Sequence, residues 1–208
     1  MRTIAFYFYF FGYLLCSIPL LNKIKKRKET TLSVEEQDRL DHVFPKKWAK
    51  TLVKISGADV TVIGEENIPA GPVLFVANHE GNFDIPILLS GLKKPFGFIS
   101  KIEVTKIPIV HKWMEVMNCV FMDRKDRRQS IKAIRQGIEV LKNGHSIVVF
   151  PEGTRSKGGP VQEFKAGSLR LGTDAHVPIV PVAIKGTSTI MEKNKGWIKP
   201  GTVTVTVL

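Results

Sequence analysis

The chain has 208 residues, of which 43% are apolar, and a formal net charge of +12. The apolar content excludes a disordered chain, and two cysteines are too few for a disulfide scaffold or an all-cysteine zinc site. The length suits one domain with a small appendage, and the positive charge predicts an acidic partner: nucleic acid, an anionic membrane or an anionic substrate. Cys16 lies in an apolar run and Cys119 in a predicted strand, so we expect both thiols to be buried, in a reducing compartment.

The N-terminus carries an apolar segment, residues 4–21, without a charged side chain. As a helix it would be about 27 Å long, marginally enough to cross the hydrocarbon core of a bilayer. Pro19 and the tyrosines near its start fit an interfacial or tilted helix as well as a straight span, and a buried core helix is the remaining alternative. Basic residues follow at once and predict a membrane anchor with the rest of the chain on the cytoplasmic side: Lys23, Lys25, Lys26, Arg27 and Lys28.

A second helix is predicted from Ser33 to Ile55. Ser33 and Glu36 have the spacing of a capping box, and Pro45 is expected to kink or split the helix. One face is apolar and the other carries lysines, which is typical both of a helix on an anionic leaflet and of a helix packed on its own domain. We therefore divide the chain into a two-helix membrane anchor, residues 1–56, and a globular domain, residues 57–208.

From residue 58 onward, strand patterns alternate with helix patterns. The predicted strands are residues 60–64, 73–78, 96–100, 119–122, 146–150, 179–185 and 202–208. The predicted helices are residues 83–90, 109–117, 128–142 and 165–174. Several strands are continuously apolar, as expected for strands covered on both faces. The pattern predicts an α/β fold with a mixed, largely parallel central sheet flanked by helices, in which ligands bind at the carboxyl ends of the strands.

The loop after the second predicted strand carries His79 and Asp84. Gly81 and Asn82 favour a tight turn, and Asp84 is well placed as the N-cap of the following helix. Across such a turn the carboxylate can accept the imidazole N–H and raise the basicity of the other ring nitrogen. No nucleophile motif such as G-x-S-x-G lies in the chain, so this base would act on a hydroxyl of a substrate. One alternative is that the His–Asp hydrogen bond only stabilises the turn. Another is that the two residues bind a metal, which is disfavoured because no second His or Cys follows at the spacing of metal ligands.

Three other strand ends carry a basic residue. Lys101, Arg124 and Arg155 each follow a predicted strand, so they should meet His79 at one edge of the sheet. A guanidinium offers a planar fork to a phosphate, and three cations beside a His–Asp pair indicate a phosphate pocket rather than separate surface charges. Glu152, just after the fifth predicted strand, either holds Arg155 in place or binds a substrate hydroxyl.

Four sequence blocks, in order, resemble the motifs of the glycerophospholipid acyltransferases. NHEGNFD at 78–84 matches N-H-x4-D, FMDR at 121–124 matches F-x-x-R, FPEGTRS at 150–156 matches the third motif, and VPIVPVAI at 177–184 matches the proline-containing fourth. FKAGS at 164–168 also looks like the family's Phe-Lys-x-Gly element. The resemblance covers roughly residues 57–208. Among the branches of the family, the chain looks most like the bacterial 1-acyl-sn-glycerol-3-phosphate acyltransferases.

The resemblance implies a reaction and a set of residue roles. His79 would be the general base for the sn-2 hydroxyl of lysophosphatidic acid, and Asp84 would orient it. The hydroxyl would attack an acyl thioester of acyl-carrier protein or coenzyme A and give phosphatidic acid in phospholipid biosynthesis, without an acyl-enzyme, a metal or an organic cofactor. An apolar tunnel would hold the acyl chain, and backbone N–H groups near the third and fourth motifs would stabilise the oxyanion. The acceptor would be bound by Lys101, Arg124, Glu152, Gly153, Thr154 and Arg155.

The motifs leave the acceptor open, since glycerol 3-phosphate or another lysophospholipid is an alternative. A second alternative is a non-enzymatic, basic lipid-binding protein of the membrane surface. A nucleic-acid binder ranks last, because no basic groove interleaved with aromatic residues is evident. The expected location is the cytoplasmic face of the cell membrane, with a single N-terminal anchor or monotopic attachment. The expected partners are lysophosphatidic acid, the acyl carrier and an anionic membrane surface.

Overall fold

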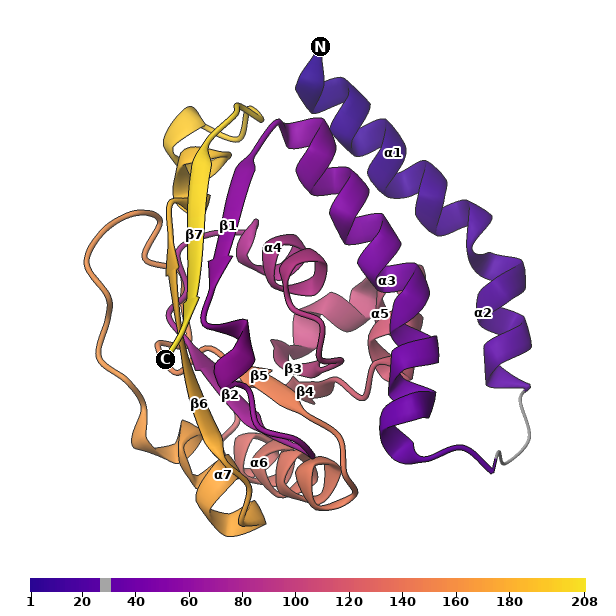
Figure 1. Ribbon diagram of the computed structural model, residues 1–208, viewed down its shortest axis with the longest axis vertical. Helices are drawn as coiled ribbons and strands as arrows, with labels where there is room; N and C mark the ends of the chain where they lie inside the picture. Colours follow the sequence, from indigo (N-terminus) through magenta and orange to yellow (C-terminus); the bar gives the residue numbers. More distant parts are fainter. Residues whose placement is uncertain (27–30) are drawn as a thin grey trace.

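In the computed structural model, which describes residues 1–26 and 31–208, a seven-stranded sheet separates two layers of helices (Figure 1). The strands are β1 (Asp59–Ile63), β2 (Leu74–Ala77), β3 (Gly97–Lys101), β4 (Val120–Met122), β5 (Ile147–Val149), β6 (Ile179–Lys185) and β7 (Thr202–Val207). The α-helices are α1 (Arg2–Cys16), α2 (Ile18–Lys25), α3 (Val34–Ser56), α4 (Asp84–Gly91), α5 (Pro108–Val116), α6 (Arg127–Lys142) and α7 (Arg170–Ala175). Every predicted strand is confirmed to within one residue at each end.

The order of the strands decides where a site can form. The sheet runs β1-β7-β6-β2-β5-β3-β4, and every neighbouring pair is parallel except β6 and β7, which are antiparallel. The predicted fold class, an α/β fold with a mixed and largely parallel sheet, is confirmed. The carboxyl ends of β2, β3, β4, β5 and β6 therefore lie at one edge of the sheet, which is where such folds bind ligands.

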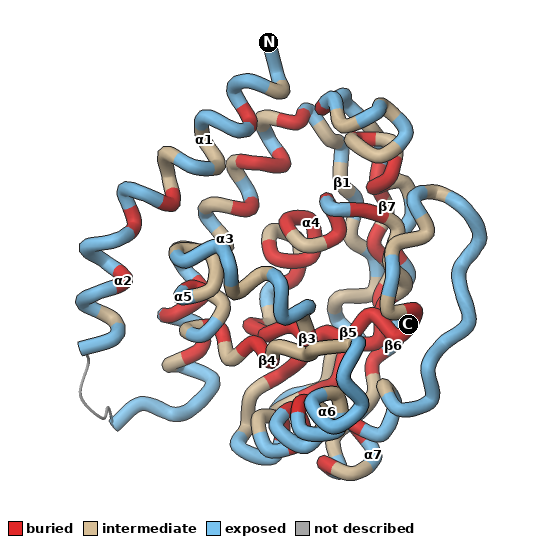
Figure 2. Tube along the Cα trace, turned by 180° about the vertical axis from the view of Figure 1, so that it is seen from behind, coloured by how far each residue is buried: buried red, intermediate tan, exposed pale blue. Residues whose placement is uncertain are grey.

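Strand β2 is the central strand, and its two faces pack on different helices. Phe75 and Ala77 join a core with α3 and α4, whereas Leu74 and Val76 join a core with α6 and α7. All four residues are buried, as expected for a strand covered on both faces. Figure 2 shows α4 enclosed between the sheet and α3, while α6 turns one side to solvent. The loop that follows β2 thus begins at a strand that is buried on both faces.

The N-terminal apolar segment forms two helices instead of the single helix predicted. α1 and α2 meet at Ser17 with an angle of 42° between them. Pro19 explains the break, because it has no N–H for the carbonyl four residues earlier and its ring would clash with that group. The buried Ser17 hydroxyl donates to the Leu14 carbonyl (2.5 Å) and accepts from the indole N–H of Trp113 on α5 (2.8 Å). The bend is therefore fixed against the domain.

The length of these helices bears on the predicted anchor. In the described part of the chain, no single helix is long and apolar enough to span a bilayer, whereas the bent pair of α1 and α2 meets those criteria together. Lys23, Lys25 and Lys26 lie at the end of α2. Arg27 and Lys28, the rest of the predicted basic cluster, fall outside the described residues.

Helix α3 runs unbroken through Pro45, so the predicted split is wrong. Pro45 is buried, and the apolar residues of the same face pack on α1 and α4, which compensates for the hydrogen bond that proline cannot make. The predicted capping box is confirmed, since Glu36 N–H donates to Ser33 Oγ (3.3 Å) and Ser33 N–H donates to Glu36 Oε2 (2.9 Å). Most of the predicted basic face lies in solvent: Lys47, Lys50 and Lys54.

The two cysteines differ in their surroundings. Cys119 is buried just before β4, and burial raises the pKa of its thiol to about 12. Cys16 is exposed, so the expectation that both thiols are buried is wrong for this residue. The reason is that Cys16 ends α1 on its outer side, whereas Leu14 faces the domain.

Candidate active site

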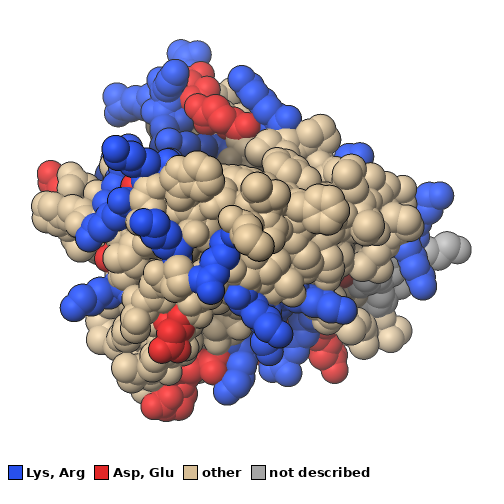
Figure 3. Space-filling view, turned by 90° about the horizontal axis from the view of Figure 1, so that it is seen from above, with Lys and Arg blue, Asp and Glu red and all other residues tan. Residues whose placement is uncertain are grey.

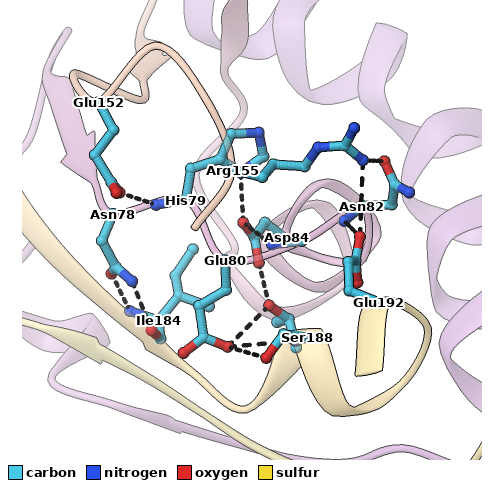
Figure 4. A network of polar contacts seen from close by, with 12 residues as sticks. Asn78, His79, Glu80, Asn82, Asp84, Glu152, Arg155, Ile184, Ser188 and Glu192 are labelled. Atoms are coloured by element: carbon cyan, nitrogen blue, oxygen red, sulfur yellow. Dashed lines mark hydrogen bonds and ion pairs between the residues drawn. The ribbon is translucent and has the colours of Figure 1, made fainter. Parts of the chain in front are cut away.

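The loop after β2 is attached to β6 by the side chain of Asn78. Its amide nitrogen donates to the Ile184 carbonyl (2.8 Å), and its carbonyl oxygen accepts from the Ile184 N–H (2.7 Å). The Asn78 side chain thus donates one hydrogen bond to the β6 backbone and accepts another from it, as a paired strand would. It does so one residue beyond the end of β2. This pair fixes where the turn at residues 79–83 begins (Figure 4).

His79 and Asp84 meet across this turn. His79 Nδ1 lies 2.5 Å from Asp84 Oδ2, and the carboxylate is fully buried. Asp84 is the first residue of α4 and Phe83 takes the N-cap position, so the predicted capping role of Asp84 is wrong. Its side chain turns back and accepts from His79 and from the Gly81 N–H (3.0 Å). The His–Asp pair expected from the sequence is therefore formed.

The imidazole of His79 is held flat against Phe150. The two ring centroids are 4.1 Å apart and the planes differ by 17°. The side chain is 18% exposed and lines a cavity. With Nδ1 donating to the carboxylate, Nε2 is the ring nitrogen that remains to accept a proton. Within residues 1–26 and 31–208, no group of three or more His, Cys, Asp or Glu residues could hold a metal ion.

Glu152 is buried beneath the same turn. One carboxylate oxygen accepts from the His79 N–H (2.6 Å) and the other from the Gln162 N–H (2.8 Å). One of the two hypotheses drawn from the sequence was that Glu152 holds Arg155 in place. That hypothesis is wrong, because both carboxylate oxygens of Glu152 accept from backbone N–H groups. Glu152 and Gly153 are not among the described residues that line the cavity, whereas Thr154 is.

A second set of contacts, which sequence reasoning missed, comes from the segment after β6. The buried Thr187 hydroxyl donates to Asp84 Oδ1, so both oxygens of that carboxylate are engaged. Glu80 holds this segment in place, because its Oε2 accepts from the N–H groups of Gly186 (2.9 Å) and Ser188 (3.3 Å). Gly186 and Thr187 directly follow a strand whose carboxyl end lies beside that of β2. Their place in the chain was therefore a signal that could have found them.

Arg155 is held by Asn82 and Glu192 (Figure 4). Its NH1 donates to Asn82 Oδ1 and lies 3.7 Å from Glu192 Oε1, which also accepts from the Asn82 N–H (2.7 Å). The Glu192 side chain is only 7% exposed. A Cβ at Gly81 would come within 2.5 Å of Glu192 Oε2, so any larger residue there would displace this carboxylate. The turn and the guanidinium are thus positioned by one buried acid.

The three predicted cations come together. Lys101, Arg124 and Arg155 line the same cavity as His79. The Arg124 guanidinium also donates to the Gly153 carbonyl. Gly153 has a φ of +70°, a conformation that favours glycine. Partial burial lowers the pKa of the Arg124 guanidinium, and a nearby carboxylate opposes this shift. A bound anion would restore the charge stabilisation that this guanidinium loses on leaving water.

The cavity has a volume of about 660 Å³ and combines this polar set with apolar walls. Its size lies in the range of ordinary small-molecule sites. The walls come from helices that are far apart in the sequence: Phe6, Phe10 and Leu14 of α1, Trp48 and Leu52 of α3, and Trp113 of α5. The N-terminal segment is therefore part of the site and not only an appendage of the domain.

Comparisons with known proteins show the family to which the chain belongs. A protein-family model described as Acyltransferase matches residues 59–185, which include the His–Asp pair and all four sequence blocks. The chain belongs to the acyltransferase family. A Mycoplasma pneumoniae relative of this acyltransferase, named probable 1-acyl-sn-glycerol-3-phosphate acyltransferase, is 40% identical over 146 residues, which are 68% of this chain and 54% of the relative. The 1-acyl-sn-glycerol-3-phosphate acyltransferase of Chlamydomonas reinhardtii is 35% identical, over 100% of this chain and 62% of its own length.

A solved structure is also similar to this acyltransferase. The crystal structure of the 1-acyl-sn-glycerophosphate (LPA) acyltransferase PlsC from Thermotoga maritima matches with a TM-score of 0.85 at 33% identity, over 100% of this chain and 82% of that one. The curated relatives are longer, since the chain spans 54–62% of the two named above. The resemblance drawn from the four sequence blocks is confirmed.

Proposed function

We propose that this acyltransferase transfers a fatty acyl group from an acyl thioester to the sn-2 hydroxyl of lysophosphatidic acid and so forms phosphatidic acid in phospholipid biosynthesis. The observation that carries the proposal is the His79–Asp84 pair beside three cations in a cavity with apolar walls. One such site can bind a phosphate, activate a hydroxyl and hold an acyl chain. The named relatives and the Thermotoga maritima structure carry this activity in their names.

The chemistry needs no nucleophile from the protein. His79 Nε2 takes the proton of the acceptor hydroxyl as its oxygen attacks the thioester carbonyl. Asp84, buried and bonded to Nδ1, stabilises the imidazolium that forms. When the tetrahedral intermediate collapses, the carbon–sulfur bond breaks and the thiolate takes the proton back from Nε2. The products are phosphatidic acid and the free thiol of the carrier.

The acceptor phosphate would be bound by Lys101, Arg124 and Arg155, with Thr154 at the wall of the same cavity. A planar guanidinium binds phosphate oxygens in pairs, which suits the two arginines. Glu152 and Gly153 have a supporting role in this proposal. Glu152 holds the backbone of His79, and the carbonyl of Gly153 orients Arg124.

The apolar walls suit the acyl chain of the donor or of the acceptor. They extend from α4 and β3, next to the His–Asp pair, to α1, α3 and α5. Backbone N–H groups near the third and fourth motifs remain the predicted stabilisers of the oxyanion. The carrier is acyl-carrier protein or coenzyme A, and the basic surface suits both, because each is acidic.

A matrix of acceptors and donors tests this function. Purified protein is assayed with lysophosphatidic acid, glycerol 3-phosphate and a second lysophospholipid, each with acyl-carrier protein and coenzyme A thioesters. We expect transfer to lysophosphatidic acid to exceed the others. Transfer to glycerol 3-phosphate alone would reject the proposed acceptor. Lipid binding without turnover for any pair would favour the non-enzymatic alternative.

Arg155→Ala is expected to lower kcat/KM for lysophosphatidic acid, mainly by raising KM. A charge-assisted hydrogen bond contributes about 1.5–3 kcal/mol, which corresponds to a factor of roughly 10 to 150. Steady-state kinetics with varied acceptor measures the effect. Arg170→Ala is the matched control, because Arg170 lies exposed on α7 and pairs only with Asp174 among the described contacts. Equal kinetics for wild type and Arg155→Ala would remove Arg155 from the phosphate site.

We also propose that residues 1–56 attach the domain, residues 57–208, to the cytoplasmic face of the cell membrane. Four large apolar side chains of α1 are exposed at helical spacing and form one outward stripe: Ile4, Phe8, Phe11 and Leu15. Lys23, Lys25 and Lys26 follow at the end of α2, where Lys25 pairs with Glu115 (2.7 Å), and their positive charge suits anionic headgroups. Both features are typical of a helix that lies in a bilayer interface.

Replacing Phe8, Phe11 and Leu15 together with serine is expected to release most of the protein from anionic vesicles in a flotation assay. The stripe loses its apolar surface, whereas the cavity walls Phe6 and Phe10 stay intact. Ile131→Ser with Val161→Ser is the control, since both residues are exposed outside the N-terminal segment. If the stripe variant floats as well as wild type, α1 is not the anchor.

A further inference from the structure

The segment between β6 and β7 presents an exposed tryptophan among lysines. In residues 191–199, here called the 191–199 loop, Trp197 is 62% exposed. Three lysines of the loop are exposed as well: Lys193, Lys195 and Lys199. Its single carboxylate, that of Glu192, is turned inward toward Asn82 and Arg155. The outward chemistry of the loop is therefore one amphipathic ring and three positive charges.

The loop is firmly held, so Trp197 is presented outward by the fold. Gly196 N–H and Asn194 N–H both donate to the Met191 carbonyl (3.1 Å each), and Trp197 N–H donates to the Asn194 carbonyl (3.0 Å). The next residue, Ile198, is 4% exposed and joins the core. The indole is therefore held in solvent by the fold, where it is available to a partner outside the chain.

The position of the loop indicates what that partner is. Ile198 N–H donates to Thr3 Oγ1 on α1 (3.0 Å), so the loop adjoins the helix that carries the outward apolar stripe. Figure 1 places the loop and the start of α1 at the same end of the molecule. Figure 3, which looks onto that end, shows a broad uncharged surface bordered by many Lys and Arg side chains and by fewer Asp and Glu side chains. Tryptophan and lysine are the side chains that favour an anionic bilayer surface.

We propose that the 191–199 loop is a second membrane contact, in which Trp197 enters the headgroup region of an anionic bilayer and Lys193, Lys195 and Lys199 bind lipid phosphates. The inference rests on the proposed function, because it needs a substrate that resides in a membrane. Met191 of the loop lines the cavity beside Asn82 and Arg155. If the bilayer is contacted both by α1 and by the 191–199 loop, the part of the cavity that is lined by Asn82 and Arg155 is oriented toward the lipid surface.

The test compares vesicle binding with activity on water-soluble substrates. In flotation with vesicles of phosphatidylcholine and phosphatidylglycerol, Trp197→Ala and the triple Lys193→Gln, Lys195→Gln, Lys199→Gln variant are each expected to bind at least about tenfold more weakly than wild type. The matched control, Lys132→Gln, Arg135→Gln, Lys142→Gln on α6, removes the same charge at the opposite end of the molecule and should bind like wild type. Turnover of hexanoyl lysophosphatidate with hexanoyl-coenzyme A should stay unchanged in the loop variants.

A spectroscopic measurement reports on Trp197 itself. Brominated lipid should quench wild-type fluorescence more than that of Trp197→Phe, since Trp48 and Trp113 are common to both. Equal quenching, wild-type binding of the loop variants, or equal weakening by the α6 control would overturn the proposal. Loss of short-chain turnover in proportion to binding would overturn it too, because the loop would then act on the site. Binding and quenching are measured without turnover, so failure of the proposed activity would leave these results intact.

Discussion

Replacing His79 with alanine is expected to lower kcat by about 10³-fold, the middle of the usual range for loss of a general base. The acceptor hydroxyl would lose the group that takes its proton, while the cations that bind its phosphate stay in place. Initial rates of phosphatidic acid formation measure the loss. Acceptor binding, measured by calorimetry, should change little.

His145→Ala is the matched control for this variant. His145 Nδ1 lies 2.8 Å from the buried carboxylate of Asp38, so it reproduces the His–Asp contact at the amino ends of the strands, away from the cavity. The variant should lose stability and keep its kcat. Turnover by His79→Ala at the wild-type rate would reject the base. So would a kinetically competent acyl group bound covalently to the protein, since the reaction would then use a protein nucleophile.

Asp84→Asn is expected to lower kcat by about 10⁴-fold, without a change in side-chain size. The carboxylate accepts from His79 Nδ1, Gly81 N–H and the Thr187 hydroxyl, and an amide would present its NH2 to one of these donors. The imidazolium would also lose the negative charge that stabilises it. Rates and thermal unfolding measured on the same preparations separate the loss of catalysis from the loss of folded protein.

Thr187 provides an internal check on that result. Thr187→Val removes the hydroxyl at nearly constant volume and should lower kcat by roughly 10-fold or more, the range for a hydrogen bond to a charged group. Thr187→Ser keeps the hydroxyl and should retain most of the activity. Equal kcat for the valine and serine variants would mean that the bond to Asp84 does not support catalysis.

The parts of the fold that follow from local pattern could be predicted from the sequence. The continuous apolar runs around Phe75 and Val148 predict strands covered on both faces, and both are buried as expected. His79, Lys101, Arg124 and Arg155 could be brought together because the carboxyl ends of parallel strands share one edge.

The parts that depend on contacts between distant segments could not be predicted in this way. Glu192 lies more than 100 residues from the turn that it supports, and it belongs to no motif. The two roles considered for Glu152, holding Arg155 or binding a substrate hydroxyl, did not include the contacts found, because its carboxylate accepts from backbone N–H groups of His79 and Gln162. The exposure of Cys16 depends on which side of α1 faces the domain, and an apolar run without a polar face gives no indication of that.

The contrast between the two thiols makes this chain ready for site-specific labelling. Burial and a pKa of about 12 leave Cys119 unreactive toward maleimides at neutral pH, whereas Cys16 is accessible where α1 ends. A polarity-sensitive dye can therefore be attached at one chosen point without any engineering. Its emission on addition of liposomes would report whether the bend between the first two helices enters the acyl region or stays in water.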